Sequence, residues 1–150
     1  MIDIASGAIF DVSAVTSYSL GNGQRLAGAG SITGDLEFGA GSTLTFSTTD
    51  TLTASSGTIS FASGFGIADL FGLDGTVVSE GTYTLIPGTV DLTGMDNVGL
   101  ANRVSIGGGK EAYFASGSLN VVVVPEPATL ALAACGLGLA TWHLARRRKG

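Results

Sequence analysis

Pairs of apolar residues separated by one small or polar residue recur along the first sixty residues of the chain. The pairs are Ile2/Ile4, Phe10/Val12, Tyr18/Leu20, Leu36/Phe38, Leu44/Phe46 and Ile59/Phe61. A period of two places both apolar side chains of a pair on the same face of a β-strand. Turn-forming stretches such as GNGQ and GAGS lie between the pairs. The pattern therefore predicts short strands and tight turns, which fit either a β-sandwich or a stacked β-solenoid.

The rhythm changes after Gly64. FGIADLFGLDG predicts one helical turn near residues 67–70, and GTYTLIPG predicts an alternating strand. GGGK at residues 107–110 predicts a hairpin turn, and EAYFASGSLNVVVV predicts two strands about a Ser116-Gly117 turn. The run from Leu119 to Val124 is uncharged and strongly β-prone, and it would invite aggregation as an open edge. We therefore expect this run to be paired inside a sheet.

The last 26 residues differ from the rest of the chain. In the triplet Pro125-Glu126-Pro127, each proline restricts the residue before it to extended conformations. The triplet is thus a stiff, non-helical segment that suits the groove of an enzyme. The apolar run from Ala128 to Ala145 would be about 27 Å long as a helix, near the lower limit for crossing a bilayer. The membrane-span prediction includes Ala128, Leu130, Leu132, Cys135, Gly136, Leu137, Gly138, Leu139, Trp142 and Ala145.

A cluster of four cations, Arg146, Arg147, Arg148 and Lys149, follows the apolar run. Each cation would cost about 3 kcal/mol at the bilayer centre, so the cluster should stay on the cytoplasmic side and leave the body outside. Trp142 stands where an interfacial aromatic anchor belongs. A buried core helix is the alternative, but it would need a partner face, and this run is apolar all round.

The tail VPEPATLALAACGLGLATWHLARRRK resembles the PEP-CTERM sorting signal of Gram-negative and related bacteria. In that family an integral membrane cysteine transpeptidase, exosortase, recognises the Pro-Glu-Pro motif and processes the protein. The resemblance implies that Pro125, Glu126 and Pro127 are read by an exosortase-type enzyme while the apolar run holds the precursor in the inner membrane. It also implies a cell-envelope protein whose product reaches the outer surface or the extracellular space.

The stretch GNGQRLAGAGSITGDLEFGAGSTLTF resembles the autotransporter-associated β-strand repeat, found in large surface proteins with β-solenoid passenger regions. This resemblance covers roughly residues 1–62 and implies layers of short strands that bury their apolar faces against one another. We expect an all-β fold with a β-solenoid-like repeat segment in residues 1–64 and a β-rich cap in residues 65–124. The sorting signal, with one transmembrane helix, occupies residues 125–150.

Members of the sorting family carry an N-terminal signal peptide, and MIDIASGAIFDVSAV has no basic leader before an apolar core. The chain also begins in the middle of a repeating pattern. We expect it to be the C-terminal part of a longer precursor, with a misplaced start or a decayed copy as the alternatives.

The charge distribution excludes one class of partner. Residues 1–124 contain eleven acidic residues but only Arg25, Arg103 and Lys110 as cations, a net charge of about −8. Binding to nucleic acid depends on Lys and Arg at the phosphates, so we expect no nucleic-acid partner.

The sequence offers few residues for catalysis. The single histidine, His143, lies in the tail, so the body lacks a Ser-His or Cys-His pair and a histidine metal site. Cys135 is the single cysteine, which excludes an intrachain disulfide and fits a small apolar residue of the span. We expect no cofactor. The acidic pairs Asp35/Glu37 and Asp69/Asp74 remain candidates for acid–base cleavage of a polysaccharide.

Three functions stay open on these grounds. The leading one is a non-enzymatic envelope or extracellular-matrix protein that is exported and sorted through its C-terminus, with extracellular polysaccharide as a candidate partner of the body. The second is a surface adhesin whose membrane anchor is never processed. The third is a polysaccharide-acting enzyme of β-solenoid shape.

Overall fold

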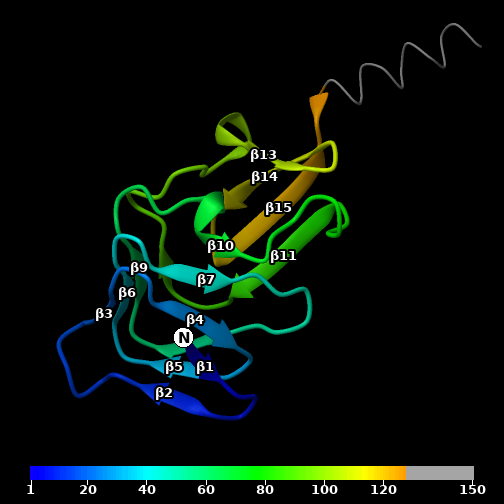
Figure 1. Ribbon diagram of the computed structural model, residues 1–150. Coiled ribbons are helices and arrows are strands. Elements are labelled where there is room, and N and C mark those ends of the chain that lie inside the picture. Colours follow the sequence, from blue (N-terminus) through cyan, green and yellow to red (C-terminus); the bar gives the residue numbers. More distant parts are fainter. Residues whose placement is uncertain (128–150) are drawn as a thin grey trace, which may run out of the picture.

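The computed structural model describes residues 1–127, whose regular secondary structure consists almost entirely of short stacked β-strands joined by turns and loops (Figure 1). The predicted all-β class is therefore confirmed. Apart from Pro127, which is helical although the triplet was predicted to be non-helical, the helices within this part of the chain are two single 3₁₀ turns, η1 (Ile67–Asp69) and η2 (Leu100–Asn102). The turn η1 lies where the helical turn was predicted. No helix within residues 1–127 is long and apolar enough to span a membrane.

Three parallel sheets are formed by strands that pair with the strand three places further along the chain. The first sheet contains β1 (Ile2–Ile4), β4 (Arg25–Gly28), β7 (Thr43–Thr45) and β10 (Leu70–Phe71). The second contains β2 (Ile9–Asp11), β5 (Ser31–Thr33) and β8 (Thr53–Ser56). The third contains β3 (Tyr18–Leu20), β6 (Leu36–Phe38), β9 (Ile59–Phe61) and β12 (Val90–Asp91). The chain thus passes repeatedly through the same three sheets.

The register of these sheets places apolar side chains above one another. Leu20 lies opposite Phe38, which in turn lies opposite Phe61. Each predicted apolar pair has at least one member inside a strand, so the strand prediction for this region is confirmed. β10 and β12 extend the parallel pairing beyond residue 64, where we had predicted the boundary of the repeat segment.

A fourth sheet is antiparallel and has the order β11-β15-β14-β13. Its strands are β11 (Gly81–Ile86), β13 (Val104–Gly107), β14 (Lys110–Ala115) and β15 (Leu119–Pro125). β15 lies between β11 and β14, which confirms that the Leu119–Val124 run is paired inside a sheet. The predicted turns at residues 107–110 and 116–117 join β13 to β14 and β14 to β15.

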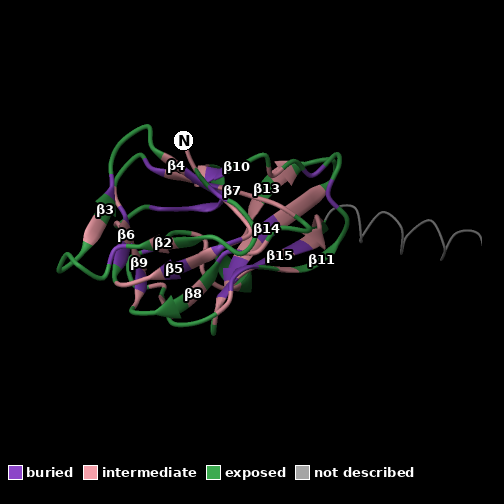
Figure 2. Cartoon of the chain, turned by 90° about the horizontal axis from the view of Figure 1, so that it is seen from below, coloured by how far each residue is buried: buried purple, intermediate pink, exposed green. Residues whose placement is uncertain are grey.

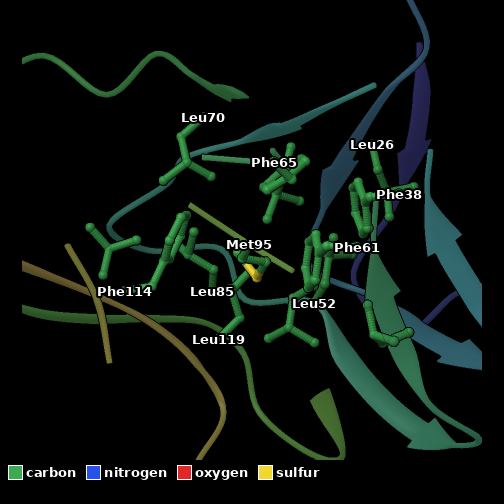
Figure 3. Packing of buried hydrophobic residues seen from close by; sticks show 14 of the residues in the cluster. Leu26, Phe38, Leu52, Phe61, Phe65, Leu70, Leu85, Met95, Phe114 and Leu119 are labelled. Carbon is green, nitrogen blue, oxygen red and sulfur yellow. The ribbon is translucent and has the colours of Figure 1, made fainter. Parts of the chain in front are cut away.

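One continuous apolar core joins the parallel and antiparallel sheets. In Figure 3, Phe61 lies between Phe38 and Met95, and Leu85, Phe114 and Leu119 extend the same cluster toward the antiparallel sheet. Backbone hydrogen bonds also cross this boundary, because the Leu52 N–H donates to the Leu85 carbonyl at 3.1 Å. Exposed residues gather mainly on the connecting loops (Figure 2). The four sheets therefore form one packed body.

The close stacking of β1 on β4 depends on a glycine at the end of β4. Gly28 has a φ of +120°, and a Cβ built there would lie 2.1 Å from the Ile4 carbonyl oxygen. Gly7 also has a positive φ, +79°, but a Cβ at that position would have no atom within 4 Å. The two positions thus share a positive φ and differ in crowding.

We expect Gly7→Ala to lower the free energy of unfolding by about 1–2 kcal/mol, because an L-residue tolerates positive φ poorly. Gly28→Ala should lose about 1–3 kcal/mol more, since the added methyl overlaps the β1 backbone. Urea unfolding of both variants, followed by circular dichroism, measures the difference. Equal losses at the two positions would contradict the close approach of β1 and β4.

Candidate sorting site at the end of β15

Strand β15 leads from the core directly into the Pro-Glu-Pro triplet. Val121 and Val123 are buried, Val124 and Pro125 are partly exposed, and Pro127 is exposed. In Figure 1 the end of β15 leaves the body on the side away from β1, β2 and β5. The triplet therefore stands where the chain leaves the folded body.

The pairing of β15 changes at Val123. Val123 lies opposite Gly81 of β11 on one side and Ala112 of β14 on the other. Within the described residues, Val124 and Pro125 pair on one side, with Glu111 and Lys110 of β14. The motif thus begins on a part of the strand that has lost one of its two neighbours.

Glu126 is held by the hairpin between β13 and β14 through both its backbone and its side chain. Its N–H donates to the Gly109 carbonyl at 2.9 Å. Its Oε1 accepts a hydrogen bond from the Ser105 hydroxyl at 2.8 Å. The Ser105 oxygen in turn accepts the Gly107 N–H at 3.4 Å. The charged residue at the centre of the triplet is therefore in contact with the folded body.

The hairpin owes its shape to three consecutive glycines. Gly107, Gly108 and Gly109 have φ values of +84°, +61° and +69°, a run that residues with a Cβ would adopt only with strain. The turn is also anchored to Gly75, whose N–H donates to the Ile106 carbonyl at 2.9 Å. The Lys110 ammonium donates to the Gly75 carbonyl at 2.6 Å. This turn is thus fixed independently of Glu126.

An ion pair strengthens the hairpin beside the triplet. Arg103 on the approach to β13 pairs with Glu111 of β14 and also donates to the Leu100 carbonyl at 3.0 Å. With Lys110 bound to Gly75, both cations near the motif are engaged by the body. Glu126 is accordingly held by a hydroxyl and a backbone carbonyl of a well-braced turn.

Comparison with known protein families gives a match for this end of the chain. Residues 123–149 match the PEP-CTERM protein-sorting motif. The sorting motif predicted from the sequence is confirmed. PEP-CTERM signals are processed by exosortase, a membrane enzyme, and the motif implies a secreted protein associated with the cell envelope. No curated protein and no solved structure matches the chain.

Part of the PEP-CTERM prediction lies outside the described residues. The membrane span expected from Ala128 to Ala145, with Cys135 and Trp142, falls there, as does the basic cluster from Arg146 to Lys149. These roles stay predictions.

Three of the four carboxylates considered for catalysis accept backbone hydrogen bonds. Asp35 accepts the Thr58 N–H at 2.8 Å, and Asp69 accepts the Gly66 N–H at 2.8 Å. Asp69 and Asp74 also line different hollows, of about 100 Å³ and about 530 Å³. Glu37 lies on β6, between Ser19 and Ser60 of the neighbouring strands. The structure therefore does not bring Asp69 and Asp74 into one cleft.

A recurring Asp-X-Ser/Thr turn was not recognised in the sequence. Hydrogen bonds from the side chain and backbone of Ser13 hold the pKa of Asp11 below its usual range, and Thr93 does the same for Asp91. The pKa of Asp74 is lowered by the backbone and side-chain hydrogen bonds of Thr76. A carboxylic acid that donates a proton in catalysis needs a raised pKa, so these three favour the opposite state. The repeated triplets DVS, DGT and DLT were the available signal.

The described residues offer little to hold a metal ion. Among residues 1–127, no group of three or more His, Cys, Asp or Glu side chains lies close enough together for that purpose.

The 530 Å³ hollow is lined by Phe46, Tyr83, Val77 and Asp74 among others, and the rings of Phe46 and Tyr83 meet edge to face at 5.4 Å. The end of β15 is thus the best-defined candidate site in this part of the chain.

Proposed function

We propose that this chain is a non-enzymatic envelope or extracellular-matrix protein that an exosortase-type membrane transpeptidase sorts through its C-terminus. The observation that carries the proposal is the PEP-CTERM match at residues 123–149, with its Pro-Glu-Pro triplet placed where β15 leaves a folded body. The non-enzymatic role is supported by Asp35, Asp69 and Asp74, whose carboxylates accept backbone hydrogen bonds.

The proposal includes an architecture. The parallel pairing of every third strand supports a β-solenoid related to the autotransporter-associated repeat, and the antiparallel sheet would close one end of it. The apolar run after the triplet would anchor the precursor in the inner membrane as one transmembrane helix before the product reaches the outer surface or the matrix. Extracellular polysaccharide is the partner that we propose for the body.

Expression of the full chain in hosts that differ only in the sorting enzyme tests this function. We expect mass spectrometry to find the C-terminal tail removed in the host that has the enzyme and intact in the host that lacks it. An intact tail in the membranes of both hosts would overturn the sorting role and favour the permanently anchored adhesin. The proposed function therefore requires that the tail be removed only in the host that has the sorting enzyme.

A further inference from the structure

We propose that the β13–β14 hairpin is a latch over the sorting motif, and that the sorting enzyme reads the motif only after the end of β15 detaches from it. The latch consists of Ser105 and the Gly107–Lys110 turn. The inference rests on the proposed function, because it concerns the regulation of the same site.

The latch already forms hydrogen bonds with the backbone and side-chain groups of the motif that the sorting enzyme would need to bind. An enzyme that binds an extended peptide as an added strand needs its backbone N–H and C=O groups, and it gains specificity from the side chains. The Glu126 N–H already donates to Gly109, and the Glu126 carboxylate already accepts from Ser105. Since Pro125 and Pro127 have no N–H, Glu126 carries the one backbone donor of the triplet.

Space around the motif is also limited. Pro125 still pairs with Lys110, and the predicted membrane span begins at Ala128. Two residues lie between them, so the three steps from residue 125 to residue 128 reach at most about 11 Å. A groove that enclosed the triplet would therefore compete with the hairpin for the same position.

Detachment can remain local. Val121 and Val123 are 0% and 2% exposed, and Val123 has strand partners on both sides. Val124 and Pro125 are paired on one side and only half-buried. Strand ends of this kind open more easily than the core. Residues 124–126 can thus separate from the hairpin while the rest of β15 stays in the sheet.

Ser105 is the residue that sets the strength of the latch without belonging to the matched motif. The Gly107 N–H donates to the Ser105 oxygen, and the Ser105 hydroxyl donates to Glu126, so the two bonds polarise each other. Because this bond is exposed to solvent, its removal should have the effect of an ordinary hydrogen bond and raise the open fraction roughly two- to tenfold.

The test uses the full chain with Ser105→Ala, Ser105→Thr and a control, Ser55→Ala. Ser55 lies on the exposed face of β8, and its hydroxyl makes no hydrogen bond within residues 1–127. A pulse-chase in the host that has the sorting enzyme measures the rate of tail loss. Hydrogen exchange of the protein in mild detergent measures the opening of the Glu126 amide, the one amide between the two prolines.

We expect Ser105→Ala to raise both the exchange rate of Glu126 and the rate of tail loss by roughly two- to tenfold. Ser105→Thr, which retains the hydroxyl, and Ser55→Ala should behave like the wild type. If exchange rises and tail loss is unchanged or slower, the hairpin presents the motif rather than covering it, and the latch is overturned. Unchanged exchange in Ser105→Ala also overturns it. Failure of the wild type to lose its tail would refute the proposed function and this regulation, while the exchange measurement would still show whether Ser105 holds Glu126.

Discussion

Phe38→Ala is expected to lower the free energy of unfolding by about 3–5 kcal/mol, a large part of the total stability of a domain of this size. Phe38 on β6 is completely buried. Its ring stacks on Phe61 at a centroid distance of 4.9 Å and meets Phe65 edge to face at 5.6 Å. The substitution removes these contacts and leaves a cavity between layers of short strands that cannot collapse without breaking their register.

Phe71→Ala is the matched control for this prediction. Phe71 on β10 is 56% exposed, and the Arg25 guanidinium lies 3.7 Å from its ring centroid. A cation–π contact at an exposed position contributes about 0.5–1 kcal/mol, so the control should lose no more than roughly that amount. Urea unfolding of the full chain in mild detergent, followed by near-ultraviolet circular dichroism, compares the two. Similar losses for Phe38→Ala and Phe71→Ala would mean that the Phe38 cluster is not the packed centre of the parallel sheets.

The strands were predictable where apolar residues alternate, and less so where they do not. The strands β3 and β6 were predictable from the pairs Tyr18/Leu20 and Leu36/Phe38, because both members of each pair face the core. By contrast β8, with the sequence TASS, contains no large apolar residue, and its place in the second sheet depends on pairing with β5. Such a strand is specified by its neighbours, which a local pattern does not reveal.

The arrangement of the strands was harder to predict than their positions. The recurring apolar pairs indicate a repeat but not its length, since Tyr18 lies opposite Leu36 whereas Leu36 lies opposite Ile59. The number of residues between stacked strands therefore varies, because the connecting turns differ in length. Glycines such as Gly28 indicate close approach only once the partner strand is known.

The sorting motif and its surroundings illustrate the same limit. The triplet at residues 125–127 was evident from the proline restriction and the apolar run that follows. The contact between Glu126 and Ser105 was not evident, because the two residues are 21 positions apart in the sequence. GGGK predicted the turn correctly, yet nothing local to the turn indicates that the Gly109 carbonyl accepts the Glu126 N–H.

Glu126→Gln is expected to slow removal of the tail by the sorting enzyme roughly ten- to hundredfold. The enzyme is proposed to read the carboxylate of the triplet, and a hydrogen bond to a charged group contributes about 1.5–3 kcal/mol, which corresponds to that range of rates. Glutamine preserves the size of the side chain, the backbone N–H and an oxygen that can accept from Ser105, so the fold and the latch should persist. The rate of tail loss in the host that has the enzyme, followed by mass spectrometry, provides the measurement.

Glu80→Gln provides the same chemical change at an exposed position before β11, and it should leave the rate of tail loss unchanged. The comparison separates recognition of the motif from the general effect of one fewer negative charge on an acidic body. It also separates recognition from the latch, because a weaker latch speeds processing whereas a lost carboxylate slows it. Wild-type processing of Glu126→Gln would show that the enzyme reads the two prolines and the extended backbone rather than the charge of Glu126.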